Sequence, residues 1–393
     1  MGINIKNLQL RNEPILFLIL GLILTDFLGH SIYWCYLTVP FVLFSSRNNL
    51  DIFKSNLFLI FSFSILYFTC LLINRSPDSN AILVGYLFFP STFYFIGRYL
   101  IKAYPNYNTV FFTFFLLASL FSILPFIANI ISVNQSGFMT ERNIRLIWSN
   151  QSEITRATIV GSYFALGLSL FPILLIKTEL PNMAFYKIWA ALLLSSALFA
   201  TFNMSNRTGL LILFTTFLAY LYTADKKFKV WTFITLLFIL TAISYQNDIF
   251  HVQSWFESTQ YYERLSGSTL TDDGSRIILW EKAMGRLAEN PTGETDYSIK
   301  ADYAHNLWLD CGLKAGMIPM IFLIIISIVA IITIYKVTSK VRNDEFLRYL
   351  IIGFGLAFFI TFMLEPILEG YQILFYMFFL YFGIVDGISK QFK

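Results

Sequence analysis

The chain has 393 residues, of which 56% are hydrophobic, 18% aromatic and only 13% charged. Soluble domains usually carry about a quarter charged residues, so this composition excludes a protein with an ordinary water-exposed surface. The net charge of +4 is small, and the basic residues lie between apolar runs, which gives no reason to expect a nucleic-acid partner.

Apolar runs long enough to cross a hydrocarbon core of about 30 Å recur along almost the whole chain. We therefore predict an all-α, polytopic membrane protein of about twelve transmembrane helices, with residues 1–393 forming a single integral membrane domain. The predicted spans are residues 14–29, 31–44, 56–73, 81–100, 109–131, 157–176, 188–201, 208–222, 230–245, 315–335, 346–364 and 372–388. The first two are short, and if they form one helix the number of spans is odd. Lys6 and Arg11 precede the first run with no small-residue cleavage site, which favours a retained helix over a removed signal peptide.

The distribution of basic residues predicts the orientation. With the N-terminus inside, 17 of the 28 Lys and Arg residues lie in inner loops and tails, and only 5 lie in the short outer loops. The other 6 belong to one long outer loop and its exit. Because Lys and Arg of short loops stay on the cytoplasmic side, we expect both termini to be cytoplasmic.

Two outer segments, residues 132–156 and 246–304, are too long to be simple turns. The second is a large loop inserted between the ninth and tenth predicted helices. It contains apolar residues at helical spacing, namely Ile277, Trp280, Met284 and Leu287. With Asp273 or Ser275 as a cap and Pro291 beyond the end, this pattern predicts a short amphipathic helix lying on the membrane surface.

Arginine is concentrated on the predicted outer side, which holds eight of the 13 arginines, whereas lysine dominates the inner side. The planar guanidinium group binds phosphate or carboxylate through two parallel hydrogen bonds and keeps its charge when partly buried. We therefore predict an outer site for an anionic headgroup. The candidate ligands are Arg207 and Arg276, then Arg264 and Arg286, with Arg142 and Arg145 as secondary candidates.

Arg207 lies in the polar break Ser-Asn-Arg-Thr-Gly between two apolar helices. Ser205 or Asn206 can cap the next helix, whose first amides and positive dipole end would then face the same place, and a diphosphate would fit there. The alternative is an arginine that extends from a helix end to water. For Arg276, the alternative is a salt bridge to an aspartate at position 272 or 273.

His305, one of three histidines, lies where the long loop re-enters the membrane. A histidine there could accept a proton from a sugar hydroxyl, and the alternative is an interfacial hydrogen-bonding residue. Asp310 follows one helical turn later, and Glu365 and Glu369 lie in a tight outer turn. Acids near a span are costly unless paired, so we expect partners, and the outer arginines are one source. Paired-carboxylate glycosidase chemistry has no supporting spacing.

Several catalytic motifs are absent from the sequence. There is no phosphate-binding Gly-Lys-Ser/Thr loop, no HExxH zinc motif, no GxSxG nucleophile elbow and no Asp-x-Asp pair. The three cysteines have no metal-ligand spacing. These absences argue against an ATPase and a metal-dependent sugar-nucleotide transferase, and we predict no metal and no cofactor.

Three short motifs follow one another along the chain: Ser-Asn-Arg-Thr-Gly-Leu-Leu at 205–211, Gly-Ser-Arg-Ile-Ile-Leu-Trp at 274–280, and Ala-His-Asn-Leu-Trp-Leu-Asp at 304–310 with Gly316 downstream. In this order, and with twelve spans and one large outer loop, the chain resembles the O-antigen polymerase and O-antigen ligase superfamily of bacterial surface-polysaccharide enzymes. It departs from the usual Arg-Gly or Arg-Ala of that family, because Thr208 follows Arg207.

The resemblance implies a metal-independent, inverting glycosyltransferase of lipopolysaccharide biosynthesis in the bacterial inner membrane. Such an enzyme moves a glycan from undecaprenyl diphosphate to a sugar hydroxyl at the periplasmic face. Arg207 and Arg276 match the arginines around the diphosphate, and His305 matches the loop-exit histidine that activates the acceptor. The implied partners are the undecaprenyl-diphosphate-linked oligosaccharide, membrane lipids and a chain-length regulator protein.

Three functions remain open from the sequence. An O-antigen polymerase, which the aromatic spans and compact loop favour, extends a carrier-linked repeat, whereas an O-antigen ligase transfers the glycan to lipid A core. A transporter of polysaccharide or lipid carrier would have the same number of spans. Transporters usually place ionisable residues deep within their spans, whereas here Asp26 is nearly the only one, which favours chemistry at the outer face.

Overall fold

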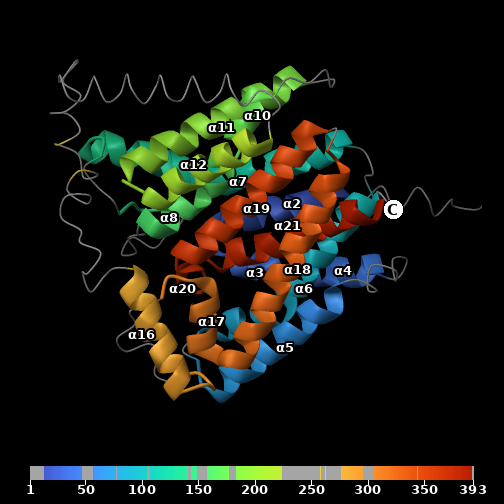
Figure 1. The fold of residues 1–393 in the computed structure, drawn as a ribbon, viewed down its shortest axis with the longest axis vertical. Coiled ribbons are helices and arrows are strands. Elements are labelled where there is room, and N and C mark those ends of the chain that lie inside the picture. The colour runs from blue at the N-terminus through green and yellow to red at the C-terminus, as the bar shows by residue number, and fades with distance from the viewer. Residues whose placement is uncertain are drawn as a thin grey trace, which may run out of the picture.

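The computed structural model describes residues 13–46, 56–76, 78–103, 107–139, 143–147, 157–176, 183–223, 257, 262, 276–294, 304–342 and 344–391. Within these ranges the chain is helical and contains no β-strand (Figure 1). The helices are α2 (Glu13–Leu24), α3 (Ser31–Cys35), α4 (Thr38–Ser46), α5 (Leu57–Ile73), α6 (Asn80–Ala103), α7 (Tyr107–Ser136), α8 (Ala157–Tyr163), α9 (Ala165–Leu168), α10 (Phe171–Leu175), α11 (Met183–Asn203), α12 (Arg207–Thr223), α16 (Arg276–Glu289), α17 (Leu307–Ala315), α18 (Met317–Lys340), α19 (Glu345–Leu364), α20 (Ile367–Gly370) and α21 (Gln372–Gln391).

Six of the described helices are long and apolar enough to cross a membrane: α6, α7, α11, α18, α19 and α21. Shorter apolar helices, among them α5 and α12, coincide with other predicted spans. The predicted span 230–245 lies outside the described residues, as does most of the large loop. The prediction of an all-helical protein is therefore confirmed for the described residues, and six of their helices have the length and composition to span a membrane.

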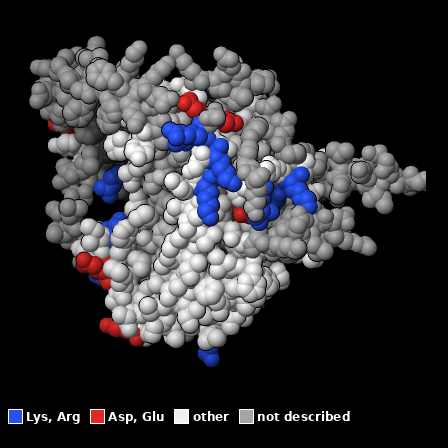
Figure 2. Space-filling view, turned by 45° about the vertical axis from the view of Figure 1, so that its right-hand side comes forward, with Lys and Arg blue, Asp and Glu red and all other residues white. Residues whose placement is uncertain are grey.

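The outward-facing surface of these helices is apolar. On α18, Ile318, Ile325 and Ile332 expose between 41% and 61% of their surface. Figure 2 shows a broad area without charged side chains, with most of the Lys, Arg, Asp and Glu residues gathered along its borders. Water would penalise such a contiguous apolar area, whereas lipid tails would solvate it.

Helix α21 forms the centre of the described bundle, and nearly all of its residues are buried. It lies directly against α6, because Gly97 and Gly383 leave no side chain between the two backbones. A Cβ atom at Gly97 would collide with the carbonyl oxygen of Leu380, and one at Gly383 with that of Tyr94. Farther along the same contact, the ring of Tyr376 packs edge-on against Phe89, with 5.2 Å between the ring centres.

Three of the predicted spans are broken in the structure. The span 14–29 consists of α2 and a 3-10 turn at Phe27–Gly29, and the span 31–44 is divided between α3 and α4. Residues 157–176 form three short helices, α8, α9 and α10, and no single helix. Phe164 interrupts the first pair, and Pro172 lies in the first turn of α10. Gly161 of α8 lies so close to the side-chain amide of Asn206 that a Cβ atom would not fit. The break thus lies beside the start of α12, where the candidate site begins.

Candidate functional site

The start of α12 places Arg207. Asn206 caps the helix, because its Oδ1 accepts a hydrogen bond from the backbone N–H of Gly209 at 3.1 Å. The prediction that Ser205 or Asn206 caps this helix is confirmed for Asn206. Ser205 adopts a left-handed backbone with φ of 50°, which turns the chain sharply between α11 and α12. Arg207 therefore begins the first turn of α12 with an exposed side chain, at the positive end of the helix dipole.

Glu365 connects α12 with α16. It follows the last residue of α19 and is only 2% exposed. Its Oε1 accepts a hydrogen bond from the Thr208 hydroxyl at 2.5 Å, and its Oε2 lies 3.9 Å from Nη2 of Arg276. One buried carboxylate thus contacts the residue beside Arg207 and also the first residue of α16. The expectation that an outer arginine pairs with this acid is confirmed.

The two arginines influence each other electrostatically. Burial lowers the pKa of Arg276, and the charge of Arg207 lowers it further, while Glu365 and Asp310 act in the opposite direction. Arg207, Arg276, Glu365 and Asp310 therefore share one electrostatic environment. The two guanidinium groups in this environment are the hydrogen-bond donors that suit an anion.

His305 lies where the chain enters α17. Its backbone is left-handed, with φ of 52°, and its side chain is half-buried. The preceding residue, Ala304, accepts a hydrogen bond from the indole N–H of Trp280 at 3.0 Å. Trp280 lies one helical turn after Arg276 on α16, so this helix connects the Arg276 end of the site to the His305 segment.

Helix α16 covers residues 276–289, as the spacing of apolar residues predicts. Its buried residues are Leu279, Ala283 and Leu287, of which Ala283 and Leu287 share an apolar cluster with Leu313 of α17. Ile277 and Met284, predicted on the apolar face, are more than half exposed. In the structure this helix packs against α17. The face that it buries is therefore rotated away from the predicted apolar face, which included Ile277 and Met284.

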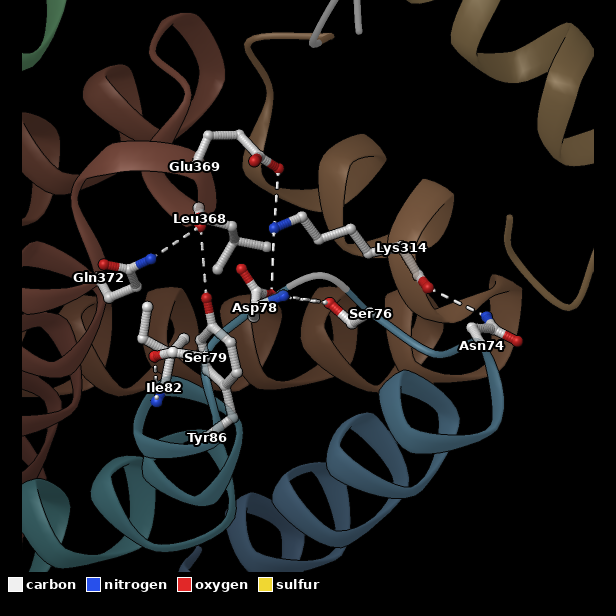
Figure 3. A network of polar contacts seen from close by, with 10 residues as sticks. All are labelled: Asn74, Ser76, Asp78, Ser79, Ile82, Tyr86, Lys314, Leu368, Glu369 and Gln372. Atoms are coloured by element: carbon white, nitrogen blue, oxygen red, sulfur yellow. Dashed lines mark hydrogen bonds and ion pairs between the residues drawn. The ribbon is translucent and has the colours of Figure 1, made fainter. Parts of the chain in front are cut away.

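Glu369 is paired with a lysine, which the sequence did not indicate. The Nζ of Lys314 lies 3.1 Å from Glu369 Oε1 and 3.4 Å from Asp78 Oδ2, so the ammonium group lies between two carboxylates (Figure 3). Burial by itself lowers the pKa of Lys314, but the charges of Glu369 and Asp78 have the larger effect, so the pKa of Lys314 is raised. The side chain of Asn74 donates to the carbonyls of Lys314 and Thr292 at 3.0 and 2.9 Å. Together these contacts fix α17 against the chain that follows α5 and against α20.

The remaining candidate residues are spread more widely. Arg286 lies ten residues after Arg276 on the same helix, which corresponds to about 15 Å along the axis. Arg145 is exposed on the segment 143–147. Arg142 and Arg264 lie outside the described residues, as do the aspartates at 272 and 273. Within the described ranges, no three His, Cys, Asp or Glu side chains come together as a metal site.

An apolar groove of about 740 Å³ lies beside this site, between α16, α17, α18 and α19. Met284 and Leu287 line it from α16, Trp308 from α17 and Phe359 from α19. Asn306, the residue after His305, borders the same groove. An extended hydrocarbon chain is the kind of molecule that such a lining can bind.

Sequence comparison adds no assignment: no model of a known protein family matches the chain, and no curated protein matches it.

Proposed function

We propose that this protein is a glycosyltransferase of the bacterial inner membrane that moves a glycan from undecaprenyl diphosphate to a sugar hydroxyl at the periplasmic face. Among such enzymes we favour an O-antigen polymerase of lipopolysaccharide biosynthesis. The observation that carries the proposal is the contact of Glu365 with both Thr208 and Arg276, which joins two arginine-bearing helix starts. The hydrogen bond from the Trp280 indole to the carbonyl of Ala304 connects the motif at 304–310, which contains His305, to the same site.

The site combines the two chemical features that a lipid-linked diphosphate needs. The arginines and the first turn of α12 supply positive charge and hydrogen-bond donors for the diphosphate. The adjacent groove between α16, α17, α18 and α19 supplies an apolar surface for part of the isoprenoid chain. An anionic head beside an apolar groove fits this donor better than it fits a free nucleotide-sugar.

The proposed reaction is a direct displacement with inversion. The acceptor hydroxyl attacks the anomeric carbon of the donor glycan and forms the new C–O bond, while the C–O bond to the diphosphate breaks. His305 takes the proton of the hydroxyl, and the undecaprenyl diphosphate departs with the bonding electron pair. Arg207 and Arg276 stabilise the charge that grows on the leaving diphosphate, and such preorganised partners typically contribute about 3–4 kcal/mol each.

The orientation that we propose places this site outside, with about twelve spans and both termini in the cytoplasm. The opposite end of the bundle supports it, because Lys336, Lys340, Arg342 and Lys390 lie at the ends of α18 and α21 remote from α17 and α20. Lysine and arginine residues close to the ends of membrane spans are retained on the cytoplasmic side.

An O-antigen ligase is the second candidate, since it uses the same donor and differs only in its acceptor. A deletion strain would distinguish the two enzymes through its lipopolysaccharide. Core capped with a single repeat is expected for loss of a polymerase, whereas bare core with long carrier-linked chains indicates loss of a ligase. A membrane-bound chain-length regulator would be a partner of the polymerase.

A transporter of polysaccharide or lipid carrier is the alternative from another class. The described ion pair within the spans, Arg98 with Asp386, lies near the end of α6 and α21 away from the candidate site, and Tyr94 donates to the same carboxylate at 2.7 Å. It therefore serves to join two packed helices. Purified protein in vesicles without any gradient should lengthen a carrier-linked glycan if it is a transferase, and should not if it only transports.

Arg276→Lys tests the role of the guanidinium fork. The charge is retained but the paired hydrogen bonds to a diphosphate are lost, so we expect at least a tenfold loss of transfer rate with unchanged folded yield. Arg342→Lys is the matched control, because Arg342 is an exposed residue just after α18 at the opposite end. Equal rates for the two variants would remove Arg276 from the diphosphate site.

A further inference from the structure

Asp310 is held in an unusual position relative to His305. It lies in the first turn of α17 and is fully buried, with 0% of its surface exposed. Its Oδ1 accepts a hydrogen bond from the backbone N–H of Ala304 at 2.9 Å, and its Oδ2 accepts one from that of Asn306 at 3.1 Å. The two oxygens of one carboxylate thus bind the amides immediately before and after His305.

This arrangement goes beyond what is needed to start a helix. Asn306 already caps α17, since its side chain accepts the N–H of Leu309 at 3.2 Å. Asp310 instead reaches back over the cap to Ala304, which lies before the helix. Burying a carboxylate is costly unless it is well bonded, and two backbone N–H groups supply that compensation.

The residue between the two amides has a conformation that requires support. His305 adopts φ of 52°, and the left-handed region is unfavourable for a residue with a Cβ atom. A non-glycine residue keeps such a conformation only when its surroundings impose it. The Asp310 carboxylate on one side, and the Trp280 indole on the carbonyl of Ala304 on the other, provide that constraint.

We propose that Asp310 is a positioning residue, whose carboxylate fixes the backbone on both sides of His305 and thereby directs the imidazole at the acceptor hydroxyl. This inference rests on the proposed function, in which His305 takes the proton. It assigns Asp310 no contact with substrate, so loss of this carboxylate should not weaken binding of the donor diphosphate. Displacement of a catalytic group by about 1 Å can reduce a rate of the order of 100-fold, which sets the size of the expected effect.

Asp310→Asn tests this role. The amide side chain keeps one acceptor oxygen but presents an NH₂ group to the second backbone N–H, so one of the two bonds is lost. We expect faster hydrogen exchange in the peptide that contains residues 304–306, a fall in kcat of the order of 100-fold, and no increase in the dissociation constant for undecaprenyl diphosphate. Asp344→Asn is the matched control, because Asp344 caps α19 by accepting the N–H of Leu347 at 3.0 Å at the far end of the bundle.

Trp280→Phe is a second variant, which removes the indole N–H but keeps an aromatic ring. It should also accelerate exchange at residues 304–306 and reduce kcat, to a smaller degree, because the Asp310 bonds remain. Unchanged exchange in Asp310→Asn, or faster exchange with an unchanged kcat, would overturn the inference. A wild-type protein without any transfer activity would refute the proposed function, and the exchange measurement would still decide whether Asp310 fixes this backbone.

Discussion

Lys314 provides a test of how the site is held together, because its ammonium group lies between the carboxylates of Glu369 and Asp78 (Figure 3). Lys314→Met keeps the apolar part of the side chain and removes the charge, leaving two acids close together. Removing one partner of a buried ion pair typically costs about 3–5 kcal/mol. Lys314 is 5% exposed, but the two acids are 12% and 15% exposed and keep some hydration, so we expect about 3 kcal/mol.

The measurement is the free energy of unfolding in mixed micelles by titration with a denaturing detergent. The double variant Lys314→Met with Glu369→Gln should be less destabilised than the sum of the two single variants, since it leaves one acid instead of two. Coupling between contacting residues is usually about 0.5–3 kcal/mol. Lys336→Met, at an exposed position near the end of α18, is the control. If it destabilises the protein as much as Lys314→Met, or if the two single effects simply add, the account of this cluster is wrong.

Three further outcomes are expected. Gly97→Val would force α6 away from the Leu380 carbonyl of α21, so the yield of monodisperse protein on size exclusion should fall severely. Gly316→Ala should lower the free energy of unfolding by about 1–3 kcal/mol, because Gly316 has φ of 91° and a Cβ atom there would lie 2.7 Å from the backbone of Thr292. Burial, then Glu369, raises the pKa of Asp310 to about 7, against the pull of two backbone amides and Lys314. The folded protein therefore binds this proton more tightly than the unfolded chain does. As the pH rises from about 4 to 7, the free energy of unfolding of the wild type, relative to that of Asp310→Asn, should fall. A rise over this range would contradict the assignment.

The same titration has an opposite consequence for activity. Asp310 accepts both backbone amides best as a carboxylate, so transfer should weaken as the pH falls below about 7, where the fold itself gains stability. The charged groups that act on Asp310 are Glu369 from α20 and Lys314 from its own helix, and Asp310 in turn acts on Arg276 of α16. Glu369→Gln should therefore shift the acidic limb of the rate profile to lower pH.

Much of the helical arrangement could be predicted because a hydrocarbon solvent permits few backbone structures. A run of about 20 apolar residues must form a helix to satisfy its amides, so the positions of α6, α18 and α21 follow from composition. The break at 157–176 could not be predicted in this way. Beside this break Gly161 contacts Asn206, which is 45 residues away, and such a contact exists only in the folded chain.

The candidate site was predicted in part. A buried acid needs a partner, and the outer arginines were one source for Glu365, which does contact Arg276. The same reasoning did not find Lys314, because a single lysine before a span resembles an ordinary boundary residue. Thr208 and Asp78 were also missed, since a hydroxyl or an acid in a short loop has no sequence pattern that reveals a partner more than 150 residues away.

Helix α16 has a mechanical property that follows from its two polar contacts. Arg276 at its first residue reaches Glu365, and Trp280 one turn later holds the carbonyl before His305. A helical turn is stiff, so the guanidinium group and the histidine segment must travel together whenever α16 shifts. In the proposed reaction, a displacement of this helix that loosened the leaving group would also misalign the proton acceptor, so the two halves of that reaction could not be adjusted separately.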